Sequence, residues 1–379
     1  MKRKFPELTL VCSSLEAGGA ERVLSDLANA WVERGHSVTL VSVYAFESGK
    51  DFFSLDPRVR RIRLADSIDL ARPSSGWWGR LLLLRRVLKE FRPKVAVAFM
   101  DKIAVTTLMA TWGLGIPVIA CERTNPAFHV IGRRWSLLRR LMYPLAGAVT
   151  VQTKTAGAGL NLKLPGLNLR VIPNAFSTVL AARKPLKRGQ GNRVPRLVAM
   201  GRLSREKGID LLVEAFSLVA GRFPRWELWV WGEGAERQRL ERQVASLGLA
   251  GRVFLPGNTA APWDELQKAD IFVLPSRYEG MPNSMLEAMA LGRPVVAFHC
   301  QGVLQELTRG GKDAVLVPEE DVKALSAELA RLMNDEAERS RLGEAALSVR
   351  ERYSPDRILA LWDELFDEVM ANTGRTARP

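Results

Sequence analysis

The stretch PSRYEGMPNSMLEAMALGRP, residues 275–294, determines how the rest of the chain is interpreted. It follows an apolar run, Ile271 to Leu274, which is short enough to be a buried parallel strand. Pro282 and Asn283 then begin a predicted helix that ends before Gly292. The loop between strand and helix therefore lies at the carboxyl end of a strand, where open α/β sheets bind their ligands.

This loop carries groups that suit an anionic ligand with hydroxyl groups. Gly280 lets the backbone approach a ligand closely, and the amides of residues 283–285 stand at a helix start, where the dipole favours an anion. Two carboxylates bracket these amides, Glu279 in the loop and Glu287 in the helix. A solvated helix face is the simpler explanation of a helical carboxylate. The apolar neighbours of Glu287 favour a ligand instead.

The nine residues EGMPNSMLE, from Glu279 to Glu287, resemble the signature of family-4 retaining glycosyltransferases, which have the GT-B fold. The resemblance implies that Glu279 contacts hydroxyls of a donor sugar and that Glu287 contacts the ribose hydroxyls of its nucleotide. It also implies that the amides between them bind the diphosphate and the sugar. The donor-binding residues predicted in this stretch are Gly280, Met281, Pro282, Asn283, Ser284, Met285 and Glu287.

A second string, GRLSREKG at residues 201–208, follows a predicted strand from Arg196 to Met200. Gly201 permits a tight exit from the strand, and the forked guanidinium of Arg202 and the ammonium of Lys207 can meet on one anion. Unrelated surface cations are the alternative. In the family that this string resembles, two such cations neutralise the leaving diphosphate. The predicted catalytic residues are Arg202, Lys207 and Glu279.

The length of 379 residues suits two domains, and 47% hydrophobic with 25% charged residues is typical of globular proteins. Strand and helix patterns alternate along the chain, so the predicted fold class is α/β. The resemblance implies the GT-B form, two doubly wound Rossmann-like domains facing a central cleft. The predicted parts are an acceptor-side domain at 1–180, a linker at 181–195, a nucleotide-sugar-binding domain at 196–353, and a helix at 354–379 that crosses back to the first domain.

The first βαβ unit contains a glycine loop. A predicted strand from Leu8 to Cys12 is followed by Gly18 and Gly19 at the start of a helix, without the GxGxxG dinucleotide fingerprint. A structural Gly-Gly turn explains this loop as well, but GGAE resembles the family loop whose backbone faces the donor phosphates and the acceptor. Two further segments, VIPNAF and VFLPG, also resemble family segments. They complete the predicted donor-binding set, which adds Gly18, Gly19, Asn174, Gly201 and Gly257.

On the acceptor side, the predicted strand from Val118 to Cys121 continues into ERTNP. Family-4 enzymes often carry a functional histidine near this loop, whereas this chain has Glu122 and Arg123 side by side. This pair of residues resembles the one found in a subgroup of the family that extends lipid-linked bacterial glycans. We expect Glu122 to orient an acceptor hydroxyl and Arg123 to meet a phosphate, with His129 as an alternative catalytic base.

The net charge of +14 is unevenly distributed, because residues 1–190 carry +17 and residues 191–379 carry −3. The first half should therefore face an anionic partner, such as nucleic acid, acidic lipid or a polyphosphate. No recognisable RNA- or DNA-binding motif occurs, which disfavours nucleic acid.

Two basic, tryptophan-containing stretches favour acidic lipid. Trp77 and Trp78 precede LLLLRR, and the run RRWSLLRRLMYP begins with Arg133, Arg134 and Trp135. Such residues suit helices at the headgroup level of an anionic membrane, although core helices with charged outer faces explain them equally. No apolar run reaches membrane-spanning length, and three widely spaced cysteines indicate neither disulfides nor a zinc site. We expect a cytoplasmic protein attached peripherally to the inner face of the cytoplasmic membrane.

The resemblance as a whole implies an enzyme of polysaccharide or glycan assembly. It would transfer a hexose or N-acetylhexosamine from a nucleotide-sugar, expected to be a UDP-sugar, to a membrane-linked glycan such as an undecaprenyl-diphosphate oligosaccharide. No DxD-like acidic cluster stands where it would hold a metal, so we expect no cofactor and no metal requirement. The alternatives are a GDP-mannose-dependent mannosyltransferase, a lipopolysaccharide-core glycosyltransferase, a sugar-nucleotide epimerase and a nucleic-acid-binding protein.

Overall fold

The computed structural model describes residues 7–16, 18–44, 51–67, 76–123, 131–185, 194–300 and 302–376, with side chains described up to residue 372. The chain divides into two compact units. The first comprises Met1–Ala175 and Asp356–Pro379, and the second comprises Phe176–Pro355. The boundary therefore falls a few residues before the predicted end of the first domain at 180, and residues 186–193 of the predicted linker lie outside the described part.

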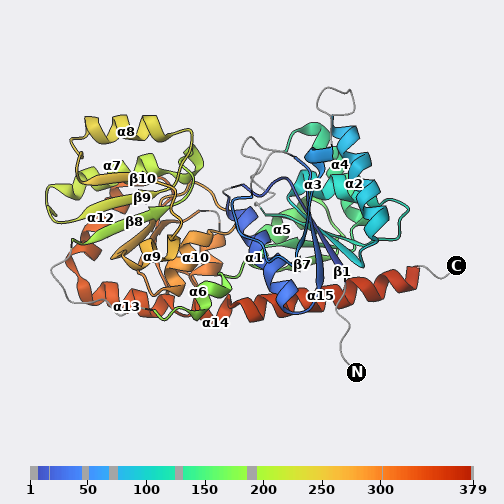
Figure 1. The fold of residues 1–379 in the computed structure, drawn as a ribbon. Coiled ribbons are helices and arrows are strands. Elements are labelled where there is room, and N and C mark those ends of the chain that lie inside the picture. The colour runs from blue at the N-terminus through green and yellow to red at the C-terminus, as the bar shows by residue number, and fades with distance from the viewer. Residues whose placement is uncertain are drawn as a thin grey trace. The chain divides into compact units, whose positions relative to one another are not determined.

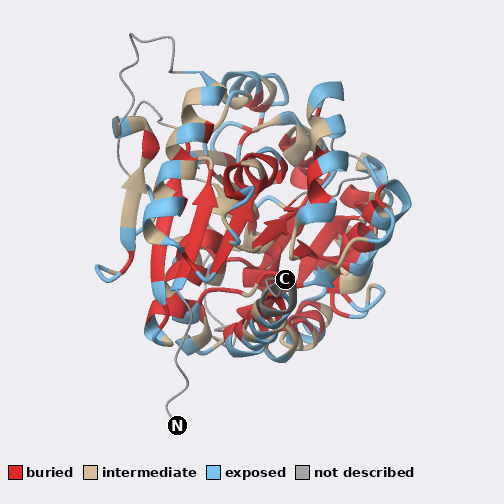
Figure 2. Ribbon diagram, turned by 90° about the vertical axis from the view of Figure 1, so that its right-hand side faces the viewer, coloured by how far each residue is buried: buried red, intermediate tan, exposed pale blue. Residues whose placement is uncertain are grey.

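The first unit is built on a parallel sheet of seven strands in the order β3-β2-β1-β4-β5-β6-β7. The central strands are apolar throughout because both faces of a parallel sheet are covered. Figure 2 shows these buried strands between helices that expose only their outer sides. The strands are β1 (Glu7–Cys12), β2 (Ser37–Ser42), β3 (Arg60–Arg63), β4 (Val95–Phe99), β5 (Val118–Cys121), β6 (Ala148–Val151) and β7 (Leu169–Val171).

Helices cover both faces of this sheet. One apolar cluster joins the sheet to α1 and α15, and a second joins it to α2, α3 and α5. The helices are α1 (Gly19–Glu33), α2 (Trp77–Phe91), α3 (Asp101–Thr111), α4 (Arg133–Met142), α5 (Lys154–Lys163) and α15 (Pro355–Thr376), with short 3-10 helices η1 (Leu64–Ser67) and η3 (Tyr143–Leu145).

The last helix, α15, is part of the core of the first unit. The ring of Trp31 in α1 is fully buried and lies 5.5 Å from that of Trp362 and 5.3 Å from that of Phe366. Arg34 at the end of α1 also donates a 2.8 Å hydrogen bond to Asp363. In Figure 1, α15 runs beside α1 under the first sheet. Residues more than 320 positions apart in the sequence thus share one core.

The second unit contains a parallel six-stranded sheet in the order β10-β9-β8-β11-β12-β13. Its apolar clusters again lie on both faces, so both units have the predicted doubly wound α/β architecture. The strands are β8 (Arg196–Met200), β9 (Glu227–Trp231), β10 (Val253–Gly257), β11 (Ile271–Leu274), β12 (Val295–Phe298) and β13 (Val315–Val317). The helices are α6 (Thr178–Ala182), η4 (Arg205–Lys207), α7 (Ile209–Ala220), α8 (Arg237–Ser246), α9 (Pro262–Gln267), α10 (Asn283–Ala290), α11 (Val303–Leu307), α12 (Val322–Asn334), α13 (Glu336–Ala346) and α14 (Val349–Arg352).

The sequence of residues 47–75 predicts an irregular, basic connection, and the structure differs from this in one part. Within it, β3 pairs with β2 as an edge strand, and η1 follows directly. The strand RRIR has no apolar pattern because an edge strand is only partly covered, and the charge of Arg61 is balanced by Asp51 at 2.9 Å. Residues 47–50 and 68–75 of this segment lie outside the described part.

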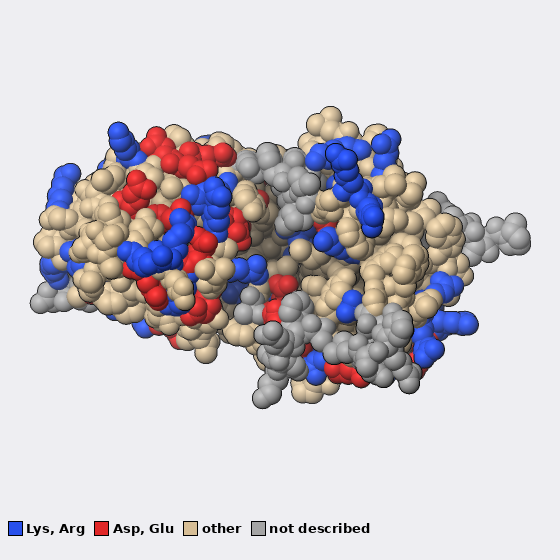
Figure 3. Space-filling view, turned by 90° about the horizontal axis from the view of Figure 1, so that it is seen from above, with Lys and Arg blue, Asp and Glu red and all other residues tan. Residues whose placement is uncertain are grey.

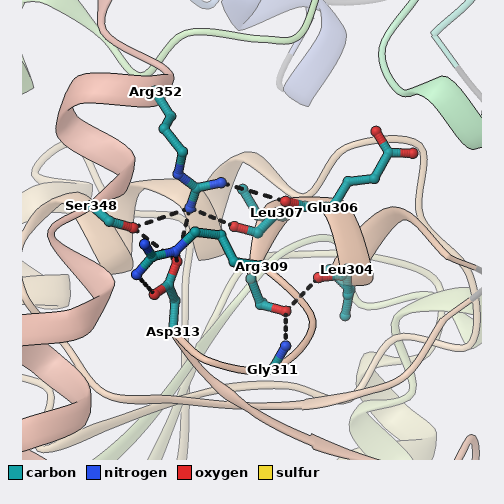
Figure 4. A network of polar contacts seen from close by, with 9 residues as sticks. Leu304, Glu306, Leu307, Arg309, Gly311, Asp313, Ser348 and Arg352 are labelled. Atoms are coloured by element: carbon teal, nitrogen blue, oxygen red, sulfur yellow. Dashed lines mark hydrogen bonds and ion pairs between the residues drawn. The ribbon is translucent and has the colours of Figure 1, made fainter.

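A buried carboxylate organises the end of the second unit. The side chain of Asp313 is 0% exposed and accepts hydrogen bonds from Arg309, from Arg352 at 2.9 Å and from Ser348 at 2.8 Å. Arg352 also donates to the carbonyl oxygen of Leu307 at the end of α11, as Figure 4 shows. This network therefore ties α14 to α11 and satisfies a helix-terminal carbonyl.

Candidate active site

The two strings singled out in the second half of the sequence lie next to each other. Their strands, β8 and β11, are hydrogen-bonded neighbours, so the loops at 201–208 and 275–282 leave the same edge of the sheet. At their contact Gly208 has φ of +63°, and a Cβ atom there would lie 1.9 Å from the carbonyl oxygen of Pro275. Only glycine permits this close approach of the two loops.

Two of the predicted catalytic residues are in direct contact across these loops. The Nζ atom of Lys207 donates to Oε1 of Glu279 at 2.7 Å, and the hydroxyl of Ser276 donates to the same oxygen at 2.7 Å. The Glu279 side chain is 7% exposed, whereas that of Lys207 is 28% exposed. Arg202, the third predicted catalytic residue, is exposed at the start of the same loop. The site therefore contains a fixed carboxylate beside two accessible cations.

The start of α10 lies at the same place. The hydroxyl of Ser284 donates to the carbonyl oxygen of Met200 at 3.0 Å, which fixes the helix start against the end of β8. The first amides of a helix have no intrahelical acceptor and carry the positive end of its dipole. Met281, Pro282 and Met285 are buried at this start, and Gly280 and Asn283 are partly exposed. Glu287, one turn further on, is 1% exposed.

Two glycines that the sequence analysis did not assign shape the neighbouring loop. A Cβ at Gly232, where φ is +139°, would lie 2.0 Å from the carbonyl oxygen of Gly201, and one at Gly234 would lie 2.2 Å from that of Leu203. Gly257, with φ of +93°, accepts a 2.8 Å hydrogen bond from the amide of Gly232. The signal was present in the string GEG directly after a strand, which is typical of a close backbone approach.

The electrostatics around this site favour a charged Glu206 carboxylate and a neutral Cys300 thiol. Burial alone would raise the pKa of Glu206, but the hydrogen bond from Ser204 and the charges of Lys207 and Arg202 hold it below its ordinary value. Burial raises the pKa of the Cys300 thiol to about 12, with the nearby Glu279 acting in the same direction. Cys300 is therefore a neutral thiol, not a nucleophile.

In the first unit, Glu122 and Arg123 follow β5 and point in opposite directions, as successive residues of an extended chain do. The Glu122 carboxylate lies inside, where it accepts from the Tyr143 hydroxyl at 2.7 Å and from Arg139 at 3.3 Å. Burial raises the pKa of Glu122 to about 7, against the lowering effect of the Arg139 charge. A direct contact between this carboxylate and an acceptor would require these bonds to be exchanged.

The Arg123 guanidinium lies on the other side of the strand. Its Nη2 donates to Oδ1 of Asn174 at 2.5 Å, and its Cζ lies 4.7 Å from the centre of the Phe99 ring. Arg123 is 8% exposed, and burial lowers its pKa to about 10. The predicted alternative base, His129, lies outside the described residues. Among the described residues, Arg123 is thus a buried cation that contacts an amide and a ring and pairs with no carboxylate.

The glycine loop of the first unit stands at the start of α1. Gly18 is the N-cap with an extended backbone at φ of −147°, and Gly19 is the first helical residue. Three predicted parts of the first unit follow the carboxyl ends of strands in its sheet. They are the glycine loop after β1, the pair Glu122 and Arg123 after β5, and Asn174 after β7. The structure thus brings the predicted residues of this unit to one edge of its sheet.

The predicted membrane-facing residues divide into packed and exposed ones. Trp77 donates to the hydroxyl of Thr106 at 3.1 Å, and its ring lies 5.8 Å from that of Trp135. By contrast, the side chain of Trp78 is exposed, and so are Arg133 and Arg134. Four large apolar residues of α2 and α4 are more than half exposed, namely Trp78, Leu82, Leu137 and Leu141. We call these four residues the α2–α4 surface.

In the part of the chain that the structure describes, no three His, Cys, Asp or Glu residues lie where they could hold a metal ion. None of the described helices has the length and apolar character needed to cross a membrane.

Two protein families match the sequence, one in each half of the chain. Residues 18–175 match the family described as Glycosyl transferase 4-like domain, and residues 184–349 match that described as Glycosyl transferases group 1. The two matches meet near the boundary between the structural units at Ala175.

Curated relatives and solved structures agree with these families. Over 366 residues the chain is 26% identical to the GalNAc-alpha-(1->4)-GalNAc-alpha-(1->3)-diNAcBac-PP-undecaprenol alpha-1,4-N-acetyl-D-galactosaminyltransferase of Campylobacter jejuni, covering 96% of this chain and 99% of that protein. Over 204 residues it is 35% identical to the exopolysaccharide phosphotransferase SCO2592 of Streptomyces coelicolor, covering 54% of this chain but only 21% of that longer protein. Alr3699/HepE of Anabaena in complex with UDP superposes with a TM-score of 0.77 at 17% identity, covering 96% of this chain and 100% of that one, which shows a shared fold.

Proposed function

The chain is a glycosyltransferase with the GT-B fold, and from this premise we propose that it moves a hexose or N-acetylhexosamine from a UDP-sugar to a lipid-linked glycan, with retained anomeric configuration. The observation that carries the proposal is the contact between Lys207 and Glu279 beside the start of α10. A cation, a carboxylate and helix-start amides together suit a diphosphate attached to a sugar.

The roles that we propose for the donor-binding residues follow from the charge that develops during transfer. When the bond between the sugar and the diphosphate breaks, negative charge grows on the departing phosphate oxygens. Arg202, Lys207 and the first amides of α10 are preorganised to stabilise that charge. Glu279 accepts hydrogen bonds from sugar hydroxyls, and Glu287 does so from the ribose.

Retention fits a front-face reaction without an enzyme nucleophile. The acceptor oxygen forms a bond to the anomeric carbon on the side from which the phosphate leaves, and the acceptor proton passes to the departing phosphate oxygen. The protein then needs to position both substrates and stabilise charge, and it needs no metal. Cys300, whose pKa is raised to about 12 by burial and by the charge of Glu279, is kept as a thiol and takes no part.

The choice of UDP and of a lipid-linked acceptor draws on the relatives. The Anabaena neighbour was solved in complex with UDP, and the name of the Campylobacter relative specifies an undecaprenol-linked acceptor. Arg123 is our candidate ligand for an acceptor phosphate, because an anion would compensate a buried guanidinium that has no carboxylate partner among the described residues. The sequence of residues 124–130 adds no Asp or Glu. GDP-mannose as donor and lipopolysaccharide core as acceptor are the alternatives.

A lipid-linked acceptor requires the enzyme to reach a membrane, and the α2–α4 surface supports this. Trp78 is 66% exposed and Leu82 65% exposed, one turn apart on α2. Arg133 and Arg134 stand exposed at the start of α4. On the face drawn in Figure 3, basic side chains predominate over the first unit, whereas acidic and basic ones are mixed over the second. We propose that this surface docks on the anionic inner leaflet of the cytoplasmic membrane.

The donor and the reaction are tested in two steps. Thermal shift with UDP and GDP should show stabilisation by UDP, since a ligand that binds the native state raises Tm. Radiolabelled UDP-hexoses and UDP-N-acetylhexosamines are then incubated with undecaprenyl-diphosphate-linked oligosaccharides, and NMR of the product reports the new anomeric centre. Selective stabilisation by GDP would redirect the proposal to a mannosyltransferase, and an inverted anomer would refute the retaining mechanism.

Membrane docking is tested by sedimentation with vesicles. The double variant Trp78→Ala/Leu82→Ala should lose binding to phosphatidylglycerol vesicles, because it removes exposed apolar area from the α2–α4 surface. Leu162→Ala/Leu218→Ala is the matched control, since both leucines are exposed elsewhere, at 86% and 59%. Equal sedimentation of the two double variants would contradict docking through this surface.

A further inference from the structure

Arg277 connects the two loops that carry Lys207 and Glu279, and no role follows for it from the sequence. It stands in the loop after β11, two residues before Glu279, and its side chain is only 16% exposed. Its guanidinium points back toward the neighbouring loop. There Nη1 donates to the carbonyl oxygen of Arg205 at 2.6 Å, and Nη1 and Nη2 each donate to the Asp210 carboxylate at 3.0 Å.

The backbone adds a further bond between the same loops. The amide of Arg277 donates to the carbonyl oxygen of Glu206 at 2.8 Å. The turn η4 is therefore held on both sides of Glu206. Before it, the carbonyl of Arg205 accepts from the side chain of Arg277, and after it, the backbone of Gly208 contacts that of Pro275. Lys207 lies between these fixed points.

The position of Lys207 relative to Glu279 thus depends on this connection. Their 2.7 Å contact joins the two loops, whose backbones Arg277 keeps at a set spacing. Lysine has several rotatable bonds and directs its charge only if its Cα is fixed. A displacement of about 1 Å in such a group can lower a reaction rate on the order of 100-fold.

We propose that Arg277 is a positioning residue for sugar transfer. It acts through Asp210 and the turn η4 to hold Lys207 at the distance from Glu279 at which both meet the diphosphate-sugar. This inference rests on the proposed function of the Lys207 and Glu279 pair. Arg277 itself does not touch the donor, since its Nε is also engaged, by Glu320 at 2.9 Å.

The planar fork explains why arginine stands here. One guanidinium reaches a carbonyl oxygen and both oxygens of a carboxylate at once, whereas an ammonium is a single point charge. Arg277→Lys therefore keeps the charge but loses the two-loop connection. Arg239 offers a matched control, because it binds the same Asp210 carboxylate at 3.2 Å from an exposed position and otherwise pairs with Glu236, three residues before it.

The first readout needs no substrate. Hydrogen exchange by mass spectrometry compares peptides covering 200–212 and 275–287 in the wild type, Arg277→Lys and Arg239→Ala. We expect faster exchange of both peptides in Arg277→Lys and unchanged exchange in Arg239→Ala. Unchanged protection in Arg277→Lys would overturn the proposed connection, whatever the enzyme transfers.

The second readout separates positioning from general stability. We expect Arg277→Lys to lower kcat about 10- to 100-fold with the donor KM within about threefold, and Arg239→Ala to stay within twofold. In a Lys207→Ala background the effect of Arg277→Lys on kcat should shrink to threefold or less, because its target is gone. A full, independent effect in that background would refute positioning through Lys207. Faster exchange in Arg277→Lys, together with a wild-type enzyme that transfers no sugar, would instead refute the proposed function and leave the connection between the loops standing.

Discussion

Replacing Glu122 by Gln should change how the stability of the first unit depends on pH. In the folded protein, burial raises the pKa of Glu122 to about 7 from an ordinary value of 4.5, although Arg139 and Tyr143 act in the opposite direction. The folded state therefore retains a proton that the unfolded chain has lost between these two pH values. Stability then falls as pH rises from about 4.5 to about 7, because the native state binds more protons.

The magnitude follows from the two pKa values. A difference of about 2.5 pH units corresponds to about 3 kcal/mol in the free energy of unfolding, lost by the wild type and not by Glu122→Gln. Glutamine keeps the shape and still accepts a hydrogen bond from Tyr143. Glu90→Gln on α2 is the control, since Glu90 is exposed.

The assay has to report the first unit separately, because unfolding of a two-unit chain need not be a single transition. Urea titrations at pH 5 and pH 8 can report the first unit separately if unfolding is monitored by the hydrogen exchange of peptides from β5 and α4. We expect the wild type and Glu90→Gln to lose about 2 to 3 kcal/mol more than Glu122→Gln between pH 5 and pH 8, which covers most of the titration. Parallel losses in all three proteins would show that the buried carboxyl does not titrate as argued.

Three further outcomes are expected. Lys207→Ala should lower kcat of sugar transfer about 100- to 1,000-fold, measured against Lys268→Ala, which removes a half-exposed lysine outside the predicted site; a rate within threefold of wild type would remove the diphosphate assignment. EDTA should leave the transfer rate within about twofold, because cations and helix amides supply the positive charge; strict dependence on added metal would contradict this. Asp313→Ala should lower the free energy of unfolding of the second unit by about 3 to 5 kcal/mol in urea titrations, since it leaves two arginines without their buried carboxylate. Glu328→Ala, at an exposed pair, should change it by less than about 1 kcal/mol.

Much of the architecture could be predicted because buried parallel strands are continuous apolar runs. The strand Ile271–Leu274 and the helix beginning at Asn283 follow the sequence pattern closely. The edge strand β3 could not be predicted from its RRIR sequence. An edge strand pairs with one neighbouring strand and is only partly covered, so it can carry charged side chains and lack the apolar pattern of a buried strand. The sequence pattern predicts one helix over residues 336–350, whereas the structure has two, α13 and α14, connected by Leu347 and Ser348.

The site was predictable where short strings carry its chemistry, and not where contacts are distant in sequence. The contact between Lys207 and Glu279 joins two strings that were each recognised separately. Arg277 gave no signal, because its role depends on Asp210, 67 positions earlier in the chain. Glu122 was expected to orient an acceptor hydroxyl, and nothing in the sequence indicated its hydrogen bond with Tyr143, 21 positions later in the chain. The alternation of a strand shows that neighbouring side chains point to opposite faces, but not which groups each of them contacts there.

The shared core of α1 and α15 has a consequence for the order in which a ribosome can deliver a folded protein. The second unit is encoded without interruption by residues 176–355, whereas the first needs residues 356 onward as well. A nascent chain that has emerged only as far as Pro355 therefore exposes Trp31, since Trp362 and Phe366 have not yet been added. The half that is translated first is thus completed last, and until then its uncovered tryptophan is a site where chaperones or aggregation can act.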